Sequence, residues 1–185
     1  MYGFDNSDEL LRKGENDYPK INFKRMNLNI KNNDYENFFD IVSCFETLEH
    51  VGNYKNAFDN LYFKLKSGGM IMVSVPDEIF LRGAVKFLAR YLKKKIPDYD
   101  PRYDLMLKRK RDGFYYFFDL LLKRDIEKYR KYPAEHYGPH LGFNYKNLEK
   151  YIYEKYIKKN KLSLLENKGV FFGFNRIYLF KKKWS

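Results

Sequence analysis

The stretch FDIVSCFETLEHVGNYKNAFDNLYFKLKSGGMIMVSVP, residues 39–76, decides the fold. It begins with Phe39–Phe45, a run of β-branched and apolar residues that is typical of a strand, and it ends with Met70–Val75, a near-continuous apolar run. Between them, apolar residues recur every three or four positions over Asn53–Lys66, which predicts a helix with one buried face that Ser67–Gly69 stops. A strand, a helix and a second, fully buried strand in this order predict a parallel α/β arrangement.

The sequence on both sides of this stretch continues the alternation of strands and helices. Upstream, Tyr2–Phe4 predicts the end of a strand, residues 5–7 predict a turn that caps a helix from Asp8, and Ile21–Leu28 predicts a short strand. We expect a single domain over residues 1–185, in which a basic helical insertion (79–135) separates a first part (1–78) from a C-terminal part (136–185). The C-terminal part is expected to hold a helix from Tyr145 to about Lys159 and two strands, one near Leu162–Leu165 with Val170–Phe172 and one at Asn175–Phe180.

The composition limits the class of protein. The chain has 185 residues, of which 44% are hydrophobic, and this is enough for one ordinary core. Its one cysteine, Cys44, cannot form an internal disulfide, and no N-terminal stretch has the pattern of a secretory signal, so a cytoplasmic protein is expected. No apolar run approaches the roughly 20 residues that span a bilayer.

The net charge of +12 is concentrated in the insertion. Residues 82–131 hold 16 lysines and arginines against seven acids, a net charge of +9. A basic stripe, defined by Arg82, Lys86, Arg90 and Lys93, recurs at intervals of three or four and suits an anionic membrane surface or an acidic substrate. A packed helix with a solvated face has the same pattern, and A+T-rich codons raise the lysine content on their own. If the stripe binds lipid, changing its four residues to Gln should abolish binding to anionic vesicles and leave the fold unchanged.

Residues 39–76 resemble the class I S-adenosylmethionine-dependent methyltransferases, whose corresponding segment has the form "fDvv…evlEHv…l…LkpGG.l..svP". The upstream YGFDNSDELL resembles the family's second strand and following helix, and INFKRMNL resembles its third strand. The downstream HLGFNYKNLEKYI resembles the family's late segment before the last two strands. The resemblance implies a Rossmann-like α/β sheet, with the insertion after the fifth strand on the substrate side.

One part of the family's pattern is not found. The family's first strand and its Gly-rich loop, of GxGxG type, come just before the acidic strand end that Asp5 represents, and no two glycines of this sequence are separated by a single residue. Such glycines let backbone amides approach the cofactor closely. The sequence therefore resembles a methyltransferase that begins at its second strand. Truncation or a misassigned start is one interpretation, and evolutionary loss of the cofactor loop is the other.

The resemblance implies a set of residues that would bind S-adenosylmethionine. Asp5 would accept hydrogen bonds from the ribose hydroxyls, although its whole role could be to cap the following helix. Asn27 would contact the adenine amino group, where the family often has Asp, and Leu28 would pack on the adenine face. Cys44 and Phe45 would line the methyl-donor pocket at the carboxyl edge of the sheet.

Two residues are candidates for a catalytic base. Glu46 follows the strand at the carboxyl edge, and His140 matches the family's substrate-side histidine, whose neutral imidazole could take a proton from an attacking hydroxyl. Glu49 and His50 start the next helix in the family, where a purely structural role is at least as consistent as catalysis. Methyl transfer from a sulfonium needs mainly positioning, so no acid–base triad is required. His136 and His140 offer no further ligands nearby, so no metal site is expected.

The sequence thus predicts S-adenosylmethionine-dependent methyl transfer to a small or carrier-linked acceptor, such as a sugar or lipid precursor. The alternative is a non-catalytic methyltransferase remnant that binds an anionic membrane surface, or nucleic acid, through its basic insertion. Aromatic residues at 114–118 could stack on bases, but such a run more often packs in a core, so nucleic acid is not the partner we expect. A cytoplasmic protein that attaches to a membrane surface agrees with both interpretations, and the sequence carries no signal for an oligomeric state.

Overall fold

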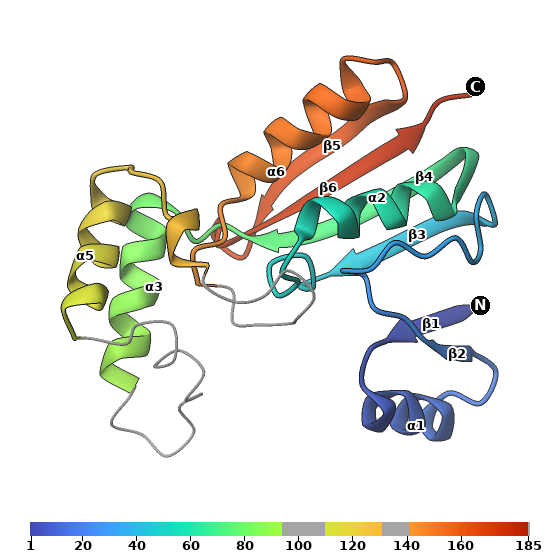
Figure 1. Ribbon diagram of the computed structural model, residues 1–185, viewed down its shortest axis with the longest axis horizontal. Coiled ribbons are helices and arrows are strands. Elements are labelled where there is room, and N and C mark those ends of the chain that lie inside the picture. The colour runs from blue at the N-terminus through green and yellow to red at the C-terminus, as the bar shows by residue number, and fades with distance from the viewer. Residues whose placement is uncertain (94–109, 131–140, 185) are drawn as a thin grey trace.

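The computed structural model of the protein describes residues 1–93, 110–130 and 141–184. Its strands form two sheets. A two-stranded parallel sheet consists of β1 (Tyr2–Asp5) and β2 (Asn22–Arg25). The larger sheet has the order β3 (Phe39–Phe45), β4 (Leu65–Pro76), β6 (Asn175–Lys182) and β5 (Leu162–Val170) (Figure 1). β3 is parallel to β4, whereas β6 is antiparallel to both of its neighbours, and this mixed sheet confirms the predicted α/β fold.

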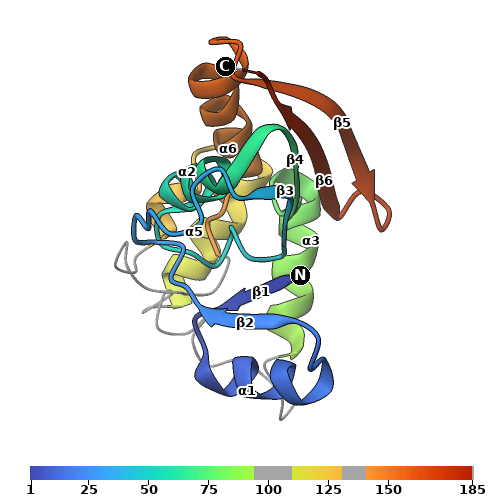
Figure 2. The ribbon, with the colours of Figure 1, turned by 90° about the vertical axis from the view of Figure 1, so that its right-hand side faces the viewer.

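The helices occupy two places around the larger sheet. α2 and α6 cover the same face of it (Figure 2), while α3 and α5 lie together beyond the carboxyl ends of β3 and β4 (Figure 1). None of the helices in the described ranges is both long and apolar enough to cross a bilayer. The helices are α1 (Asp8–Asp17), α2 (Tyr54–Lys64), α3 (Phe80–Lys93), α5 (Lys110–Leu121) and α6 (Tyr145–Ile152), with a 3-10 turn at Glu127–Tyr129 and a π-helical turn, Tyr153–Ile157, that continues α6.

β4 is the centre of the larger sheet and of the core. It pairs with β3 on one side and with β6 on the other, and Ile71, Val73 and Val75 are fully buried. These residues belong to the same buried cluster as Phe58 of α2 and Leu148 of α6. The predicted strand at Met70–Val75 is therefore confirmed. The expectation that it is fully buried is wrong, because α2 and α6 cover one face of the sheet (Figure 2) and Met70 and Met72, which alternate with these residues, are only half-buried.

The end of α2 differs from the prediction. The helix begins after Asn53, whose side chain accepts the N–H of Asn56 as an N-cap, but it ends at Lys64. β4 already begins at Leu65, so Ser67–Gly69 lie within the strand and do not stop a helix.

A bulge in β4 explains the two glycines. β3 advances by two residues, 39 to 41, while β4 advances by five, 65 to 70, so the extra residues of β4 leave the regular ladder. Gly68 has a φ of +79°, and a Cβ on Gly69 would lie 2.8 Å from the backbone oxygen of Asp40. The bulge therefore requires glycine at both positions.

The smaller sheet contacts the larger one through aromatic side chains. β1 and β3 point in the same direction in Figure 1, but they share no backbone ladder in the described part of the chain. Tyr2 and Phe4 of β1 instead pack on Phe39, with ring centroids 5.6 and 5.9 Å apart, and Tyr35 and Phe38 complete the cluster. This separation agrees with the prediction of a sheet that lacks a strand between YGFD and FDIVSCF.

A half-buried carboxylate joins the two helices on the covered face. Asp59 of α2 accepts hydrogen bonds from the hydroxyls of Tyr151 (2.8 Å) and Tyr156 (2.6 Å), and it forms an ion pair with Lys155. Tyr156 reaches Asp59 from the π-helical turn, which places it on the same side as Tyr151 although the two are five residues apart. These bonds fix α6 against α2.

The outer edge of β3 predicts a tendency to associate. Ile41 is 61% exposed and Phe45 is 50% exposed on a strand that pairs, among the described residues, only with β4. Exposed apolar residues on an unpaired strand edge favour edge-to-edge pairing between molecules. We therefore expect Ile41→Lys to increase the soluble monomer fraction, measured by size-exclusion chromatography with light scattering, and to change the free energy of unfolding by less than about 0.5 kcal/mol.

The matched control is Leu10→Lys, since Leu10 is 55% exposed but lies on α1. It should leave the monomer fraction unchanged. An equal gain in monomer from both variants would show that added charge, and not the β3 edge, controls association.

Candidate active site

The carboxyl ends of β1 and β2 bring two predicted cofactor residues together. The strands pair in parallel, with Asp5 opposite Arg25, so Asp5 ends β1 where Asn27 follows β2. The Oδ1 atom of Asp5 accepts the N–H of Ser7 at 2.8 Å, and the Oδ1 atom of Asn27 accepts the N–H of Asn29 at 3.0 Å. Each side chain therefore stabilises a turn, while its acceptor oxygens can take further hydrogen bonds. Ser7, not Asp5, is the N-cap of α1.

Leu28 lies beside this pair. It is half-buried against the core cluster, and its carbonyl accepts a hydrogen bond from the side-chain amide of Asn60 at 2.9 Å. Asn60 also donates to the carbonyl of Ile30 at 2.8 Å. The loop after β2 is thus fixed by a buried side chain of α2.

The end of β3 places three predicted residues in different environments. Cys44 is buried in the core, and this burial raises the pKa of its thiol to about 12, so the thiol remains protonated. Phe45 is half-exposed. Glu46 is exposed with a φ of +47°, and its Oε1 atom accepts the hydroxyl of Ser74 at 2.8 Å. Of the three, Phe45 and Glu46 present their side chains at the edge of the sheet.

A buried carboxyl group lies directly behind this edge. Glu49 is 1% exposed, and its pKa is raised to about 8, first by burial and then by the negative charges of Glu46 and Glu78. Arg130 opposes this shift and donates to the carbonyl oxygens of Glu49 (3.1 Å) and Val51 (2.7 Å). The Glu49 carboxyl group is consequently mostly protonated at pH 7.

The residues after β4 correct the interpretation of the basic stripe. Arg82 pairs with the buried Asp77 at 2.8 Å, and Lys86 pairs with the buried Glu78 at 3.1 Å. Two cations of the stripe are thus counter-ions of buried carboxylates rather than a solvated face, and replacing them would remove these partners from Asp77 and Glu78. That the fold is unchanged by the replacement stays a prediction. The side chains of Arg90 and Lys93, together with His140 and His136, lie outside the described residues.

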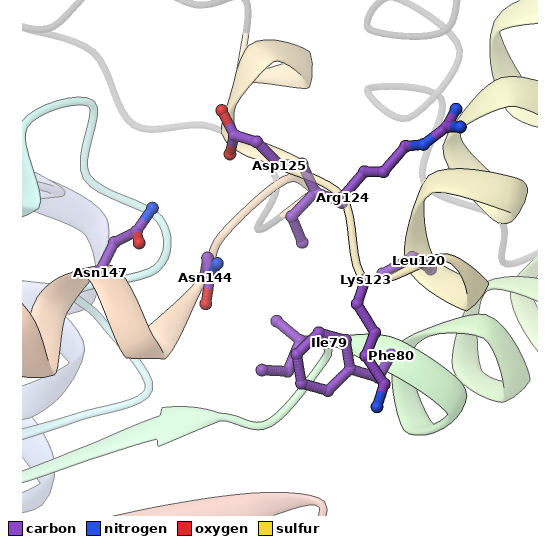
Figure 3. A pocket seen from close by; sticks show the side chains of 9 residues that line it. Ile79, Phe80, Leu120, Lys123, Arg124, Asp125, Asn144 and Asn147 are labelled. Atoms are coloured by element: carbon purple, nitrogen blue, oxygen red, sulfur yellow. The ribbon is translucent and has the colours of Figure 1, made fainter.

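A cavity of about 340 Å³ opens next to the end of β4, between the start of α3, the turn after α5 and the start of α6 (Figure 3). Figure 3 shows Lys123 alongside the ring of Phe80, whereas Arg124 and Asp125 point away from that ring. The residues that line the cavity are Ile79, Phe80, Leu120, Lys123, Arg124, Asp125, Ile126, Asn144 and Asn147.

This cavity and the predicted donor residues share one edge of the fold. β1, β2, β3 and β4 are paired in parallel within their sheets, and the donor residues and the cavity follow their carboxyl ends. Open α/β sheets bind ligands at this edge. The cavity can accommodate a ligand beside β4, while the ends of β1 and β2 offer the hydrogen-bond acceptors of Asp5 and Asn27.

A sequence profile described as "Methyltransferase domain" matches residues 1–120. The chain belongs to the class I S-adenosylmethionine-dependent methyltransferases. It is therefore a methyltransferase by family, and S-adenosylmethionine is the cofactor of that family. No match to a curated protein was found.

Solved structures agree on the fold. An S-adenosylmethionine-dependent methyltransferase from Clostridium acetobutylicum is 15% identical with a TM-score of 0.55, and the match covers 99% of this chain and 75% of that one. A methyltransferase from Methanosarcina mazei is 14% identical with a TM-score of 0.54, covering 100% and 82%. A protein from Rhodobacter sphaeroides, proposed to be a zinc-dependent alcohol dehydrogenase, is 12% identical with a TM-score of 0.58, covering 99% and 75%. At these identities the likeness concerns the fold alone.

The described residues of this methyltransferase domain fit the cofactor in part. Asp5 and Asn27 present a carboxylate and an amide at neighbouring strand ends, which suits ribose hydroxyls and an adenine amino group. The sequence has no GxG pair to bring backbone amides to the rest of the cofactor. The individual assignments of Asp5, Asn27, Leu28, Cys44 and Phe45 remain predictions.

Sequence reasoning missed the residues of the cavity. Lys123 and Asn144 lie in different elements, and no spacing rule connects them. Asn144 did carry a signal, because an Asn directly before an amphipathic helix is typical of an N-cap, and its side chain caps α6 by accepting the N–H of Lys146.

The raised pKa of Glu49 predicts a pH-dependent stability. The folded state holds this proton up to about pH 8, whereas an unfolded Glu releases it near pH 4.5, so the stabilisation is complete below pH 4.5 and is lost as the pH rises to 8. Glu49→Gln removes the ionisation. We expect the free energy of unfolding of the variant, relative to the wild type, to increase between pH 5 and pH 9 by on the order of 4 kcal/mol at most, measured by urea unfolding.

Glu166→Gln on β5 is the control, because Glu166 is exposed. Its difference from the wild type should not change with pH in this range. A difference between Glu49→Gln and the wild type that is the same at pH 5 and pH 9 would contradict the buried, protonated state of Glu49.

Proposed function

We propose that the domain transfers a methyl group from S-adenosylmethionine to a small or carrier-linked acceptor, such as a sugar or lipid precursor. The observation that carries this proposal is the position of the cavity at the end of β4, on the same edge as Asp5, Asn27 and Glu46. A donor over β1–β3 and an acceptor in the cavity would both lie along this edge. In-line transfer requires mainly that the two reacting groups are held next to each other.

Bound S-adenosylmethionine supplies an already activated methyl group. The chain's own residues then have to orient the acceptor and, where the acceptor atom carries a proton, remove it. Glu46 suits the second task because its carboxylate is exposed at the edge and is held by the Ser74 hydroxyl. His140 remains the second candidate for this base.

The donor site predicts weak cofactor binding. Asp5 and Asn27 support the ribose and adenine, but the amides of a Gly-rich loop are not supplied by this sequence. We expect residues 1–185 to bind S-adenosylmethionine more weakly than the micromolar range in isothermal titration calorimetry. A hydrogen bond to a charged group contributes roughly 1.5–3 kcal/mol, so Asp5→Asn should weaken this binding about tenfold or more.

Asp8→Asn is the matched control, because Asp8 is an exposed acid on the neighbouring helix that pairs only with Arg25 among the described residues. It should leave the affinity unchanged. Micromolar affinity of the wild type would show that the donor site is more complete than proposed. A folded chain that binds no S-adenosylmethionine at millimolar concentration would favour the non-catalytic alternative.

A second candidate function is attachment to an anionic membrane. α3 exposes Leu81 (68%), Val85 (52%) and Leu88 (48%), and α5 exposes Phe114 (60%), Phe118 (41%) and Leu121 (40%), with the same i, i+4, i+7 spacing. We call these six residues the α3–α5 apolar surface.

The packing of the two helices supports a single surface. They contact each other through Phe87 and Tyr116, whose ring centroids are 5.2 Å apart. α3 ends and α5 begins at the same end of the pair in Figure 1, so the helices are antiparallel. On each helix, the exposed apolar residues are rotated around the helix axis in the same direction from the residues that contact the other helix. In an antiparallel pair, two rows that are rotated in this way lie on the same side of the pair. Exposed apolar patches of this kind mark protein or membrane contacts.

Membrane attachment through this surface predicts loss of binding when it is made polar. Each buried apolar side chain contributes about 1.5–3 kcal/mol, so a double variant, Leu88→Asp with Phe118→Asp, should lower co-sedimentation with anionic vesicles more than tenfold. The control is Leu164→Asp with Leu165→Asp, which changes two exposed leucines on β5. A wild-type chain that does not co-sediment at low salt would contradict this candidate.

A further inference from the structure

Two lysine side chains lie against the ring of Phe80, which lines the cavity: Lys123 also lines it, and Lys146 lies between the lining residues Asn144 and Asn147 in the chain. The Nζ atom of Lys123 is 5.5 Å from the centroid of the Phe80 ring, and the Nζ atom of Lys146 is 4.6 Å from it. Their separation therefore cannot exceed the two distances combined. Lys123 follows α5 and Lys146 is in α6, so two parts of the chain that are distant in sequence bring positive charge to the same ring.

These two charges have no protein counter-ion in the described part of the chain. Neither ammonium group lies within 4.0 Å of a carboxylate among those residues. Asp125 is the one carboxylate among the lining residues, but it points away from Phe80 in Figure 3, and its Oδ1 atom accepts the N–H of Glu127 at 2.9 Å. Like charges that lie against one ring repel each other and attract an anion.

The ring that both lysines contact is held by the backbone. Phe80 has a φ of +54°, a conformation that a bulky side chain adopts only when the surroundings impose it. The surroundings are the buried acids just before it, Asp77 and Glu78, whose ion pairs with α3 fix the start of the helix. The aromatic floor of the cavity is therefore in place before any ligand binds.

Neutral donors lie on the opposite wall. The Oδ1 atom of Asn144 accepts the N–H of Lys146 at 3.0 Å, which leaves the side-chain NH₂ group of Asn144 to donate toward the cavity. The first turn of α6 adds the positive end of a helix dipole next to it. Asn147, one turn later, also lines the cavity.

The type of cation distinguishes between two anions. A carboxylate is best matched by the planar fork of an arginine, and Arg124 is paired with Asp119 at 3.6 Å and points away from Phe80. Lysines bind phosphate as point charges and can contact different oxygens of one phosphoryl group. A volume of about 340 Å³ is within the range of small-molecule sites.

We propose that the cavity between α3, α5 and α6 binds a phosphoryl group through Lys123 and Lys146, with the Phe80 ring contacting the part of the ligand next to the phosphate. The assignment of this phosphoryl group to the methyl acceptor rests on the proposed function. Phosphate binding itself does not, because it involves none of the residues at the donor site.

The test uses the full chain at low ionic strength and three probes without S-adenosylmethionine. Glycerol 3-phosphate should bind in nuclear magnetic resonance titrations, and glycerol should bind at least tenfold more weakly. A soluble short-chain phosphatidic acid distinguishes the sources of the phosphate. Tighter binding of this lipid assigns a lipid acceptor, and tighter binding of glycerol 3-phosphate assigns a water-soluble one, while either result supports phosphoryl recognition.

Charge-removing variants test the two lysines. Lys123→Gln and Lys146→Gln should each weaken glycerol 3-phosphate binding about tenfold, whereas Lys150→Gln, one turn further along α6, should leave it unchanged. Amide chemical shifts outside the cavity show that each variant is folded. Equal losses from Lys146→Gln and Lys150→Gln, equal affinity for glycerol and its phosphate, or no binding of either phosphate probe at millimolar concentration would each overturn the proposal.

Discussion

The buried carboxylates at the end of β4 are the constraint on which the functional half of the molecule depends. Asp77 is 2% exposed and is held by Arg82 from α3 and by Arg176 from β6, at 2.8 and 3.4 Å. Its N–H donates to the carbonyl of Phe174 at 2.7 Å. A buried charge without partners costs several kcal/mol, so these contacts fix the exit of β4, the start of α3 and the β5–β6 turn in one arrangement.

The ligand edge follows from that arrangement. Because α3 must start where the ion pairs hold it, Phe80 is forced into its positive φ, and its ring forms one wall of the cavity. At the ends of β1 and β2, Asp5 and Asn27 each stabilise a turn through a side-chain oxygen. The acceptor capacity that remains on these side chains is available to a ligand. The same polar side chains thus stabilise the turns at this edge of the fold and offer hydrogen bonds to a ligand.

Local sequence patterns predicted the strands well. The features that they missed depend on how the strands pair with each other. The boundaries of Phe39–Phe45 matched β3, because its apolar run ends in polar sequence on both sides. Gly68 and Gly69 were interpreted as a helix stop, since a glycine pair after a helical pattern usually is one, but the bulge opposite Asp40 depends on the register with β3, which no local pattern contains.

Counter-ions were the second thing that the sequence could not show. Arg82 and Lys86 have the spacing of a solvated stripe, and only the fold reveals that Asp77 and Glu78 are buried under them. The cavity was missed for the same reason, because Lys123 and Lys146 reach the Phe80 ring from two parts of the chain that only the fold brings together. Predictions made from one helix at a time identified the apolar and basic faces of these helices. They missed the residues of other elements against which those faces pack.

The central claim is that the donor and the acceptor share the carboxyl edge of one fold. The most direct measurement is a titration of the ¹⁵N-labelled chain with S-adenosylhomocysteine, followed by the chemical shifts of assigned amides. The account predicts changes at Asp5, at Asn27 and Leu28, and at Phe45 and Glu46, with the amides of the β5–β6 turn unaffected. Shifts that are confined to the cavity around Phe80, or that spread over β5 and β6 and spare the ends of β1 to β3, would contradict it.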